Sequence, residues 1–163
     1  MKTDLLERPQ RGADVAETGA RQFVTLILGG QLCGIAVLAV RDVLGEQMIS
    51  SVPLAPREVA GSLNLRGRIV TAIDLRLRLG LPPAPPGARR MSVVVEDQSE
   101  LYALLVDQVA EVISLQTSDL EQNPPTLPPP WADVSSGICR LEGQLLVALD
   151  VGRLLTLSDA GGY

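Results

Sequence analysis

Arg66 is the charged side chain that stands out in this 163-residue sequence as a candidate for a specific contact. It follows Leu65 and precedes Gly67, in an otherwise apolar stretch. A guanidinium binds a carboxylate through a planar fork of N–H donors that lysine lacks, and this geometry suits recognition across a protein interface. The spacing alone leaves two interpretations open, a solvated arginine in a turn or an arginine that binds a carboxylate.

Asp42 is a carboxylate in a comparable setting, between Val40 and Val43. We predict a short helix here, on which the two valines are spaced i, i+3 and approach one surface, with Asp42 offset to one side. Glu111 occupies the mirrored position in the second half of the sequence. The mirrored position indicates a structural role common to both halves, and the apolar neighbours indicate a contact surface.

Most enzyme chemistry lacks its usual residues. The sequence has no histidine, which removes the commonest general base and metal ligand, and Lys2 is its one lysine. The serine pairs at 50–51 and 135–136 therefore have no partner to take their proton. Cys33 and Cys139 are far apart and belong to no C-x-x-C motif, so a zinc site is not expected and a reducing compartment is. We predict a protein without catalytic residues, metal or cofactor.

Composition and charge argue against two other classes. The net charge is −5 and aromatic residues make up 2% of the chain, whereas nucleic-acid binding needs a basic face or stacking aromatics. The first residues lack the apolar core of a signal peptide. The apolar stretch Leu32–Val40 is about half of the roughly 20 residues that cross a bilayer. We therefore expect a cytoplasmic protein that binds no nucleic acid.

The elements that would position Arg66 and Asp42 are short. A first hairpin is predicted to turn at Gly29–Gly30 and a second around Arg66–Gly67, where glycine readily adopts a positive φ. The stretch Leu38–Leu44 has apolar residues at helical spacing. Asp74 lies where the N-cap of a further short helix belongs.

This pattern occurs twice. Residues 32–43 match residues 101–112 at an offset of 69, and residues 61–75 match residues 137–151 at an offset of 76. A unit of about 65 residues buries little surface by itself, so the two copies should pack together. Short strands at regular spacing favour small barrels over a sandwich.

The domain organisation follows from this repeat. We predict a flexible tail over residues 1–20 and one domain over 21–158. Within the domain, a first barrel is expected at about 21–81 and a second at about 91–158. The proline-rich stretch 82–90 is predicted to be a stiff linker between them.

Residues 61–76, GSLNLRGRIVTAIDLR, resemble the signature of the CheW family of bacterial chemotaxis adaptors, which reads roughly GvxNLRGxixPxxDLR. Residues 32–43 and 101–112 resemble two further segments of that family. The resemblance runs from about Gln22 to Leu155.

The resemblance implies a mostly β fold of two five-stranded SH3-like barrels with short helices. It implies a non-enzymatic scaffold that couples methyl-accepting chemotaxis receptors to the regulatory domain of the histidine kinase CheA. Such a protein is recruited to receptor arrays without being embedded in the membrane. The receptor-binding residues carried over from the family are Val40, Asp42, Val43 and Arg66. The residues of the structural motif are Gly61, Asn64, Gly67 and Asp74, and the two glycines match turn glycines.

Three positions depart from the family pattern. Cys33 stands where an aromatic residue is common, Thr71 where proline is usual, and Asp42 where glutamate is common. These departures indicate a divergent adaptor. Two alternatives stay open: a small-barrel binding module in a chemotaxis-like pathway with a non-motility output, and a small hydrolase that uses a carboxylate and water.

Overall fold

The computed structural model describes residues 20–156. The tail expected over residues 1–20 lies outside the described residues except for Ala20, which begins the first strand. The strands are β1 (Ala20–Leu28), β2 (Gln31–Ala36), β3 (Val40–Leu44), β4 (Val59–Leu65), β5 (Arg68–Asp74), β6 (Met91–Asp97), β7 (Glu100–Val106), β8 (Gln108–Gln116), β9 (Ser135–Leu141) and β10 (Gln144–Leu149). The helices are η1 (Val37–Ala39), α3 (Leu75–Arg78), η2 (Thr117–Asp119), α4 (Pro129–Val134) and α5 (Val151–Leu154).

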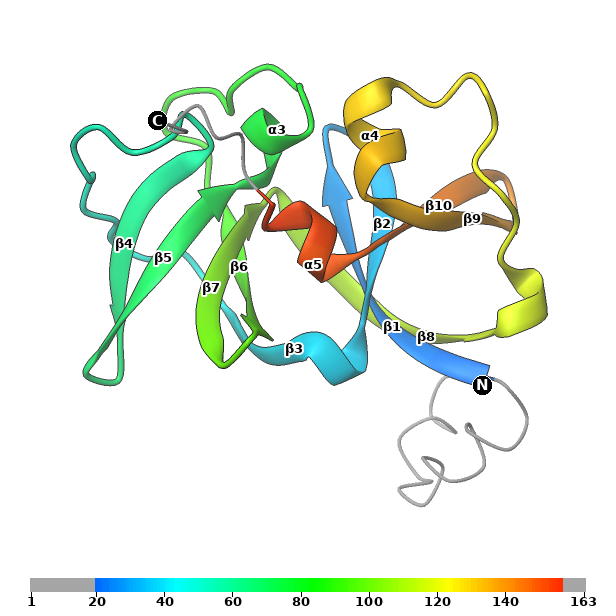
Figure 1. The fold of residues 1–163 in the computed structure, drawn as a ribbon, viewed down its shortest axis with the longest axis horizontal. Coiled ribbons are helices and arrows are strands. Elements are labelled where there is room, and N and C mark those ends of the chain that lie inside the picture. The colour runs from blue at the N-terminus through cyan, green and yellow to red at the C-terminus, as the bar shows by residue number, and fades with distance from the viewer. Residues whose placement is uncertain (1–19, 157–163) are drawn as a thin grey trace.

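Within residues 20–156 the strands form two five-stranded sheets, which lie side by side in Figure 1. The first sheet has the order β8-β1-β2-β10-β9 and is called barrel 1 below. The second has the order β3-β6-β7-β5-β4 and is called barrel 2. The predicted fold class, mostly β with two five-stranded units and short helices, is confirmed.

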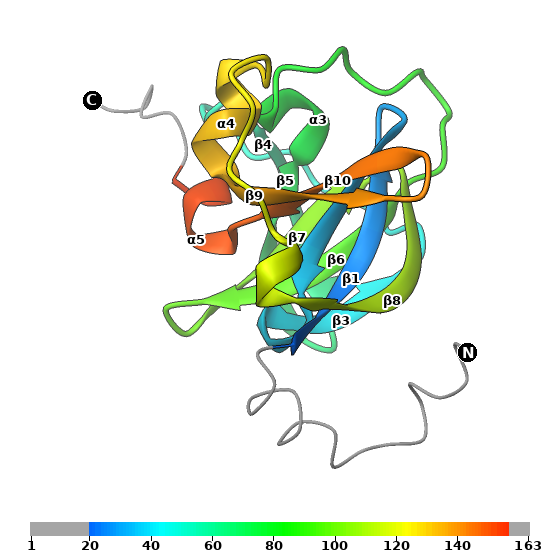
Figure 2. The ribbon, with the colours of Figure 1, turned by 90° about the vertical axis from the view of Figure 1, so that its right-hand side faces the viewer.

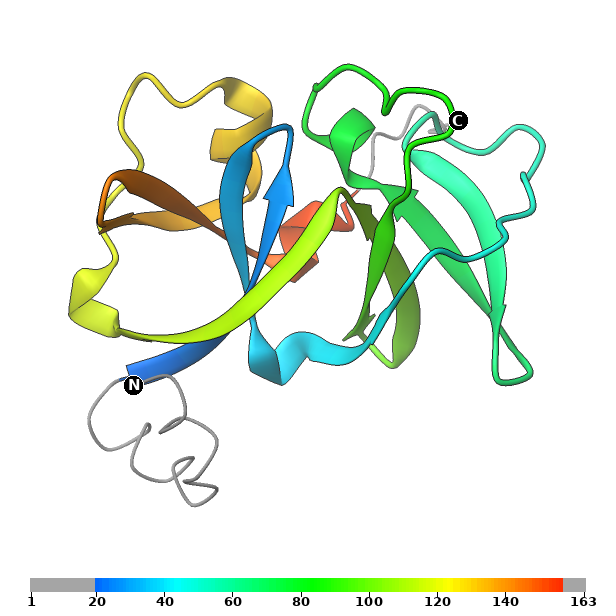
Figure 3. The same ribbon diagram turned by 180° about the vertical axis from the view of Figure 1, so that it is seen from behind.

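The barrels do not follow the two halves of the chain, so the expected division into 21–81 and 91–158 is wrong. Strand β3 leaves the first half to pair with β6, and β8 leaves the second half to pair with β1. Figure 3 shows both crossings, β3 in cyan and β8 in yellow-green. The parallel pairs β2–β10 and β5–β7 then join a hairpin of one half to a hairpin of the other. Each barrel therefore contains one hairpin from one repeat and three strands from the other.

The helix predicted over Leu38–Leu44 is a second error. A single 3-10 turn, η1, is followed by strand β3, in which Val40 pairs with Val95 and Val43 with Val93. A seven-residue window cannot separate helical spacing from strand spacing, and β-branched valines favour a strand once an edge is available for pairing.

Three other local predictions are confirmed, namely two hairpin turns and one helix cap. The strands β1 and β2 join through Gly29–Gly30, and β4 and β5 join through Arg66–Gly67. The Asp74 carboxylate accepts hydrogen bonds from the backbone N–H groups of Arg76 and Leu77, as an N-cap does. Asp150 caps α5 in the same way, in agreement with the internal repeat.

In the described part of the chain the buried side chains form three clusters, almost wholly aliphatic as the composition predicts. One cluster contains Leu26 of barrel 1 together with Val93 and Leu104 of barrel 2, so it lies between the barrels. A second, around Leu146, comes only from strands of barrel 1, and a third, around Val70, only from strands of barrel 2. The shared cluster makes one folding unit of the two barrels.

The short α-helices lie together beside the junction of the barrels (Figures 1 and 2). The Arg78 guanidinium of α3 donates to the carbonyl oxygens of Arg153 and Leu154 at the end of α5, both at 2.9 Å. These bonds satisfy carbonyl groups that a helix end leaves without partners. They also connect the end of one repeat to the end of the other.

A fragment that ends at Pro86 is predicted not to fold. It would retain β1–β5, but β1 would lose β8, β2 would lose β10, and β3 would lose β6. Since an isolated two-stranded hairpin is marginally stable at best in water, neither sheet should survive. Circular dichroism and size-exclusion chromatography should show no cooperative thermal transition. A monomeric fragment that melts cooperatively would contradict the dependence of each barrel on both halves.

Candidate functional site

The structure brings together two of the four residues predicted to bind a receptor. The Arg66 Nη2 atom lies 3.0 Å from Oδ2 of Asp42, and the two side chains form an ion pair. The Arg66 side chain is 74% exposed and that of Asp42 is 26% exposed. Arg66 therefore binds a carboxylate of its own chain, that of Asp42. The arginine side of the pair remains open to solvent.

The backbone of Arg66 is held in an uncommon conformation. Arg66 has φ = +50° and Gly67 has φ = +87°, which is the pattern of a two-residue type I′ hairpin turn. Asn64 Oδ1 accepts a hydrogen bond from the Gly67 N–H at 2.9 Å and closes this turn. A non-glycine residue in the left-handed region costs on the order of 1 kcal/mol and is often found at functional sites.

The ion pair spans the open edge of barrel 2. Strands β3 and β4 are the two edges of that sheet, and Arg66 follows β4 while Asp42 lies in β3. Ser50 and Ser62 add a backbone bridge to β4, with two N–O distances of 2.8 Å. The pair and the bridge together help to close the sheet into a barrel.

Gly61 does not lie in a turn, contrary to the interpretation drawn from the family motif. It lies within β4, has φ = +149°, and faces the backbone of Ser50. A Cβ atom at this position would be 2.1 Å from the Ser50 carbonyl oxygen, so only glycine fits. Gly137 holds the equivalent place in barrel 1, beside Glu121.

Val40 and Val43 differ in their surroundings. Val40 is half-buried and packs against the cluster between the barrels, whereas Val43 is 38% exposed. The ladder shifts register between Val40 and Asp42, so Arg41 is the extra residue of a β-bulge. Arg41 in turn forms an exposed ion pair with Glu96 at 2.7 Å.

The sequence analysis missed an ion pair that joins the barrels. Arg76 of α3 donates from Nε and Nη2 to the two carboxylate oxygens of Asp107, both at 2.8 Å, and Asp107 Oδ2 also accepts from the Gly29 N–H at 2.8 Å. The hydrogen bond from Arg76 is the main reason that the pKa of Asp107 is lowered, and the same bond raises the pKa of Arg76. Asp107 lies between β7 and β8, where the chain passes from barrel 2 to barrel 1. Two features of the sequence could have indicated this pair. Arg76 follows the helix cap Asp74, and Asp107 is a single acid after a run of apolar residues.

The described residues offer no group of three or more His, Cys, Asp or Glu side chains that could hold a metal ion. Burial raises the pKa of the Cys33 thiol, which disfavours the reactive thiolate. No helix in residues 20–156 combines the length and hydropathy needed to span a membrane.

Comparison with known proteins gives a consistent result. Residues 22–159 match the model of the CheW-like domain family. The chemotaxis protein CheW of Rhizobium meliloti is 27% identical over 82% of this chain and 86% of its own length. The chemotaxis protein CheW of Treponema pallidum is 28% identical over 85% of this chain and 84% of its own. The crystal structure of the scaffolding protein TtCheW from Thermoanaerobacter tengcongensis superposes with a TM-score of 0.75 at 26% identity and covers 85% of this chain and 94% of that one.

Proposed function

Since its CheW-like domain covers nearly all of the described chain, the protein belongs to the CheW family, and we propose that it is a non-enzymatic adaptor in bacterial chemotaxis. In this proposal it couples methyl-accepting receptors to the histidine kinase CheA by binding the regulatory domain of the kinase and the tip of a receptor. It acts in the cytoplasm and joins receptor arrays through these contacts.

The Asp42–Arg66 pair is the observation that carries the proposal. Its arginine lies within the family motif, in the β4–β5 turn, and presents a largely exposed guanidinium from a strained backbone conformation. A side chain that only closed the barrel would not need this exposure. We propose that Arg66, Asp42, Val40 and Val43 together contact the receptor, with the valines as apolar anchors and the charged pair at the rim.

Substituting Arg66 tests this role. An exposed ion pair contributes about 0–1 kcal/mol to stability, so Arg66→Ala should fold and melt within a few degrees of the wild type. Loss of a charged partner at an interface costs about 2–5 kcal/mol, so receptor-dependent kinase activity should fall at least tenfold. The measurement is kinase autophosphorylation with receptor-containing vesicles, alongside a thermal melt.

Arg68→Ala is the matched control, because Arg68 is exposed in the same hairpin and, within residues 20–156, takes part in no ion pair. The double variant Asp42→Arg/Arg66→Asp restores the internal pair with its charges exchanged. If coupling returned in the double variant, or persisted in Arg66→Ala, the pair would have only a structural role. A wild-type protein that bound neither kinase nor receptor would overturn the adaptor function itself.

A further inference from the structure

The proline-rich stretch 82–90 lies within barrel 2 and does not connect the two barrels. It leads from α3 to β6, and the strands on either side of it, β5 and β6, belong to the same sheet. Its stiffness is therefore not needed to hold the barrels apart. In Figure 1 it is the green loop along the upper side of the molecule, whereas the β4–β5 turn that carries Arg66 lies at the lower side. The stretch and the Asp42–Arg66 pair therefore lie at opposite sides of barrel 2.

Residues 82–86, Pro-Pro-Ala-Pro-Pro, are called the polyproline segment below. Proline fixes φ at about −65°, and a residue that precedes a proline avoids the helical region. Every residue from 81 to 86 is under at least one of these constraints. The segment therefore favours the polyproline II helix, which has three residues per turn and no internal hydrogen bonds. The structure assigns it neither α-helix nor strand.

The exposure of the polyproline segment repeats every three residues. Leu81 and Ala84 are half-buried. The four prolines are exposed, namely Pro82, Pro83, Pro85 and Pro86. With three residues per turn, one edge of the helix rests on the protein and the other two edges present proline rings to solvent. Within residues 20–156 the carbonyl oxygens of Pro83 and Ala84 accept no hydrogen bond, so they are open to a donor from another molecule.

Hydrogen bonds at both ends hold the polyproline segment in place. At its start, Arg76 Nη1 donates to the Pro82 carbonyl oxygen at 3.0 Å. At its end, the Ala88 N–H donates to the Pro85 carbonyl oxygen at 3.0 Å, and Gly87 has φ = +80°, as in a type II turn. A ligand that is already held in its bound conformation loses little conformational entropy on binding.

An unpaired cation follows the segment. Arg89 is exposed and, in the described part of the chain, takes part in no ion pair. Its neighbour Arg90 is by contrast bound to Asp74, at 3.2 Å. Grooves lined by aromatic side chains bind polyproline II helices, and an acidic group beside such a groove would complement the arginine. The surface therefore has the chemistry of a ligand for this kind of groove.

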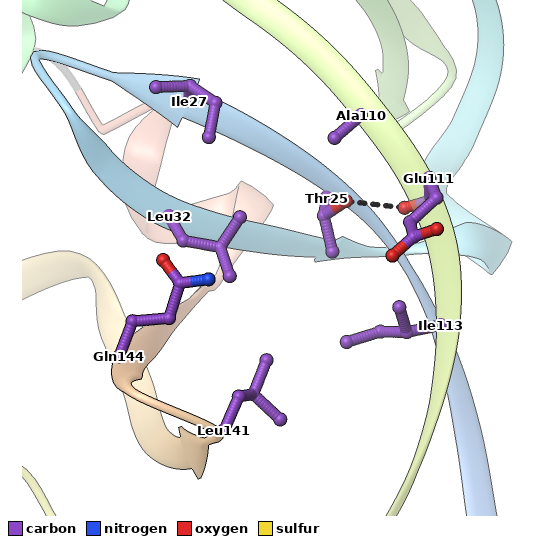
Figure 4. Close-up of a pocket in the computed structure, with 8 residues that line it drawn as sticks. All are labelled: Thr25, Ile27, Leu32, Ala110, Glu111, Ile113, Leu141 and Gln144. Atoms are coloured by element: carbon purple, nitrogen blue, oxygen red, sulfur yellow. Dashed lines mark hydrogen bonds between the residues drawn. The ribbon is translucent and has the colours of Figure 1, made fainter.

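A second copy of this chain does not supply such a groove. The aromatic residues between residues 20 and 156 are Phe23, Tyr102 and Trp131, of which Phe23 and Trp131 are buried. Figure 4 shows a cavity of about 400 Å³ in barrel 1, and its walls are aliphatic and polar side chains such as Leu32 and Ile113, without an aromatic ring. The groove must therefore belong to a different protein.

We propose that the polyproline segment is the docking site of a separate protein that has an aromatic-lined groove with an acidic group at one end. The two exposed edges of proline rings pack between the aromatic side chains of the groove. Polar N–H or O–H groups of the partner donate to the carbonyl oxygens of Pro83 and Ala84, and Arg89 pairs with the acid. The inference goes beyond the proposed adaptor function, because it concerns a surface other than the Asp42–Arg66 pair.

Photo-crosslinking in the native host cells, followed by titration, tests the proposal. The full chain carries the photoreactive residue p-benzoylphenylalanine in place of Ala88, next to the segment, or in place of Thr126 as the control position; both residues are exposed. A protein captured only from position 88 is identified by mass spectrometry, purified and titrated against the wild type by calorimetry. Pro83→Ala/Pro85→Ala removes one ring from each exposed edge and should weaken binding at least tenfold.

The controls separate loss of the docking contact from a change in the fold. Pro53→Ala/Pro125→Ala removes the same number of exposed prolines elsewhere and should bind as the wild type does. Arg89→Ala should weaken binding several fold and make the affinity less dependent on salt. Substitution of the aromatic residues in the groove of the captured protein should abolish binding. All variants should melt within a few degrees of the wild type.

The remaining outcomes would overturn the proposal. These are the absence of a crosslink specific to position 88, a crosslink only to a second copy of the chain, and wild-type affinity in Pro83→Ala/Pro85→Ala. Receptor-dependent kinase activity should be unchanged in that variant, and its loss would place the segment among the adaptor's own contacts and not at a separate docking site. A wild type that bound neither receptor nor kinase would overturn the adaptor function alone, because the titration with the captured protein does not depend on it.

Discussion

Gly61→Ala is expected to be the most destabilising single substitution considered for this protein, at about 3 kcal/mol or more. The Cβ atom of the new alanine would lie 2.1 Å from the Ser50 carbonyl oxygen. This backbone atom cannot move without breaking the bridge between Ser50 and Ser62. The φ of +149° adds strain of its own. Urea unfolding followed by circular dichroism should show a clearly lower midpoint, and for a chain of this size the melting temperature should fall by about 6–12 °C.

Gly67→Ala is the matched control. Gly67 also has a positive φ, +87°, but a Cβ atom there would meet no other atom within 4 Å. Only the conformational strain remains, which is about 1 kcal/mol. Equal unfolding midpoints for the two variants would show that the contact with Ser50 does not determine the requirement for glycine at position 61.

Asp107→Asn is expected to destabilise the protein by about 3 kcal/mol at neutral pH, since breaking a largely buried pair leaves one charge without a partner. The Arg76 and Asp107 side chains are 16% and 24% exposed, and the guanidinium would lose its bidentate acceptor. Glu96→Gln, which breaks the exposed pair with Arg41, should by contrast cost about 0–1 kcal/mol.

The destabilisation caused by Asp107→Asn should depend on pH, and the pKa of Asp107 fixes the direction of that dependence. The pKa of Asp107 is lower in the folded protein than its ordinary value, so the carboxylate contributes stability at pH values above the unfolded pKa. That contribution is lost as the pH falls through the folded pKa. The difference in unfolding free energy between wild type and Asp107→Asn should therefore be largest near neutral pH and shrink below about pH 4. A difference that did not change with pH would contradict the role of the ionised pair.

Local features of the fold were predictable because their causes are local. The Gly29–Gly30 turn, the Arg66–Gly67 turn and the Asp74 cap each depend on a few adjacent residues. The strand β3 was not predictable in this way, because its conformation comes from pairing with β6, which follows about fifty residues later.

The exchange of strands between the halves could not be deduced either. A repeat at a fixed offset is equally compatible with two separate barrels and with two barrels that share strands. The sequence pattern indicated Asp42 and Arg66 as candidate contact residues, but it did not predict that they pair. A helix at residues 38–44 would not place Asp42 at the edge of the sheet that Arg66 reaches.

The covalent connection between the two repeats has a consequence for how many different partners one molecule can hold. If the repeats were separate, identical chains related by a two-fold axis, both ends of the assembly would have the same surface. Because one chain carries both copies, each hairpin tip can change independently, and here one tip has Arg66 and the other Glu142. The pseudo-symmetric framework is thus preserved by β-sheet pairing while the two ends acquire opposite charge. A single small protein can then connect two unlike neighbours in a fixed order without the two competing for one surface.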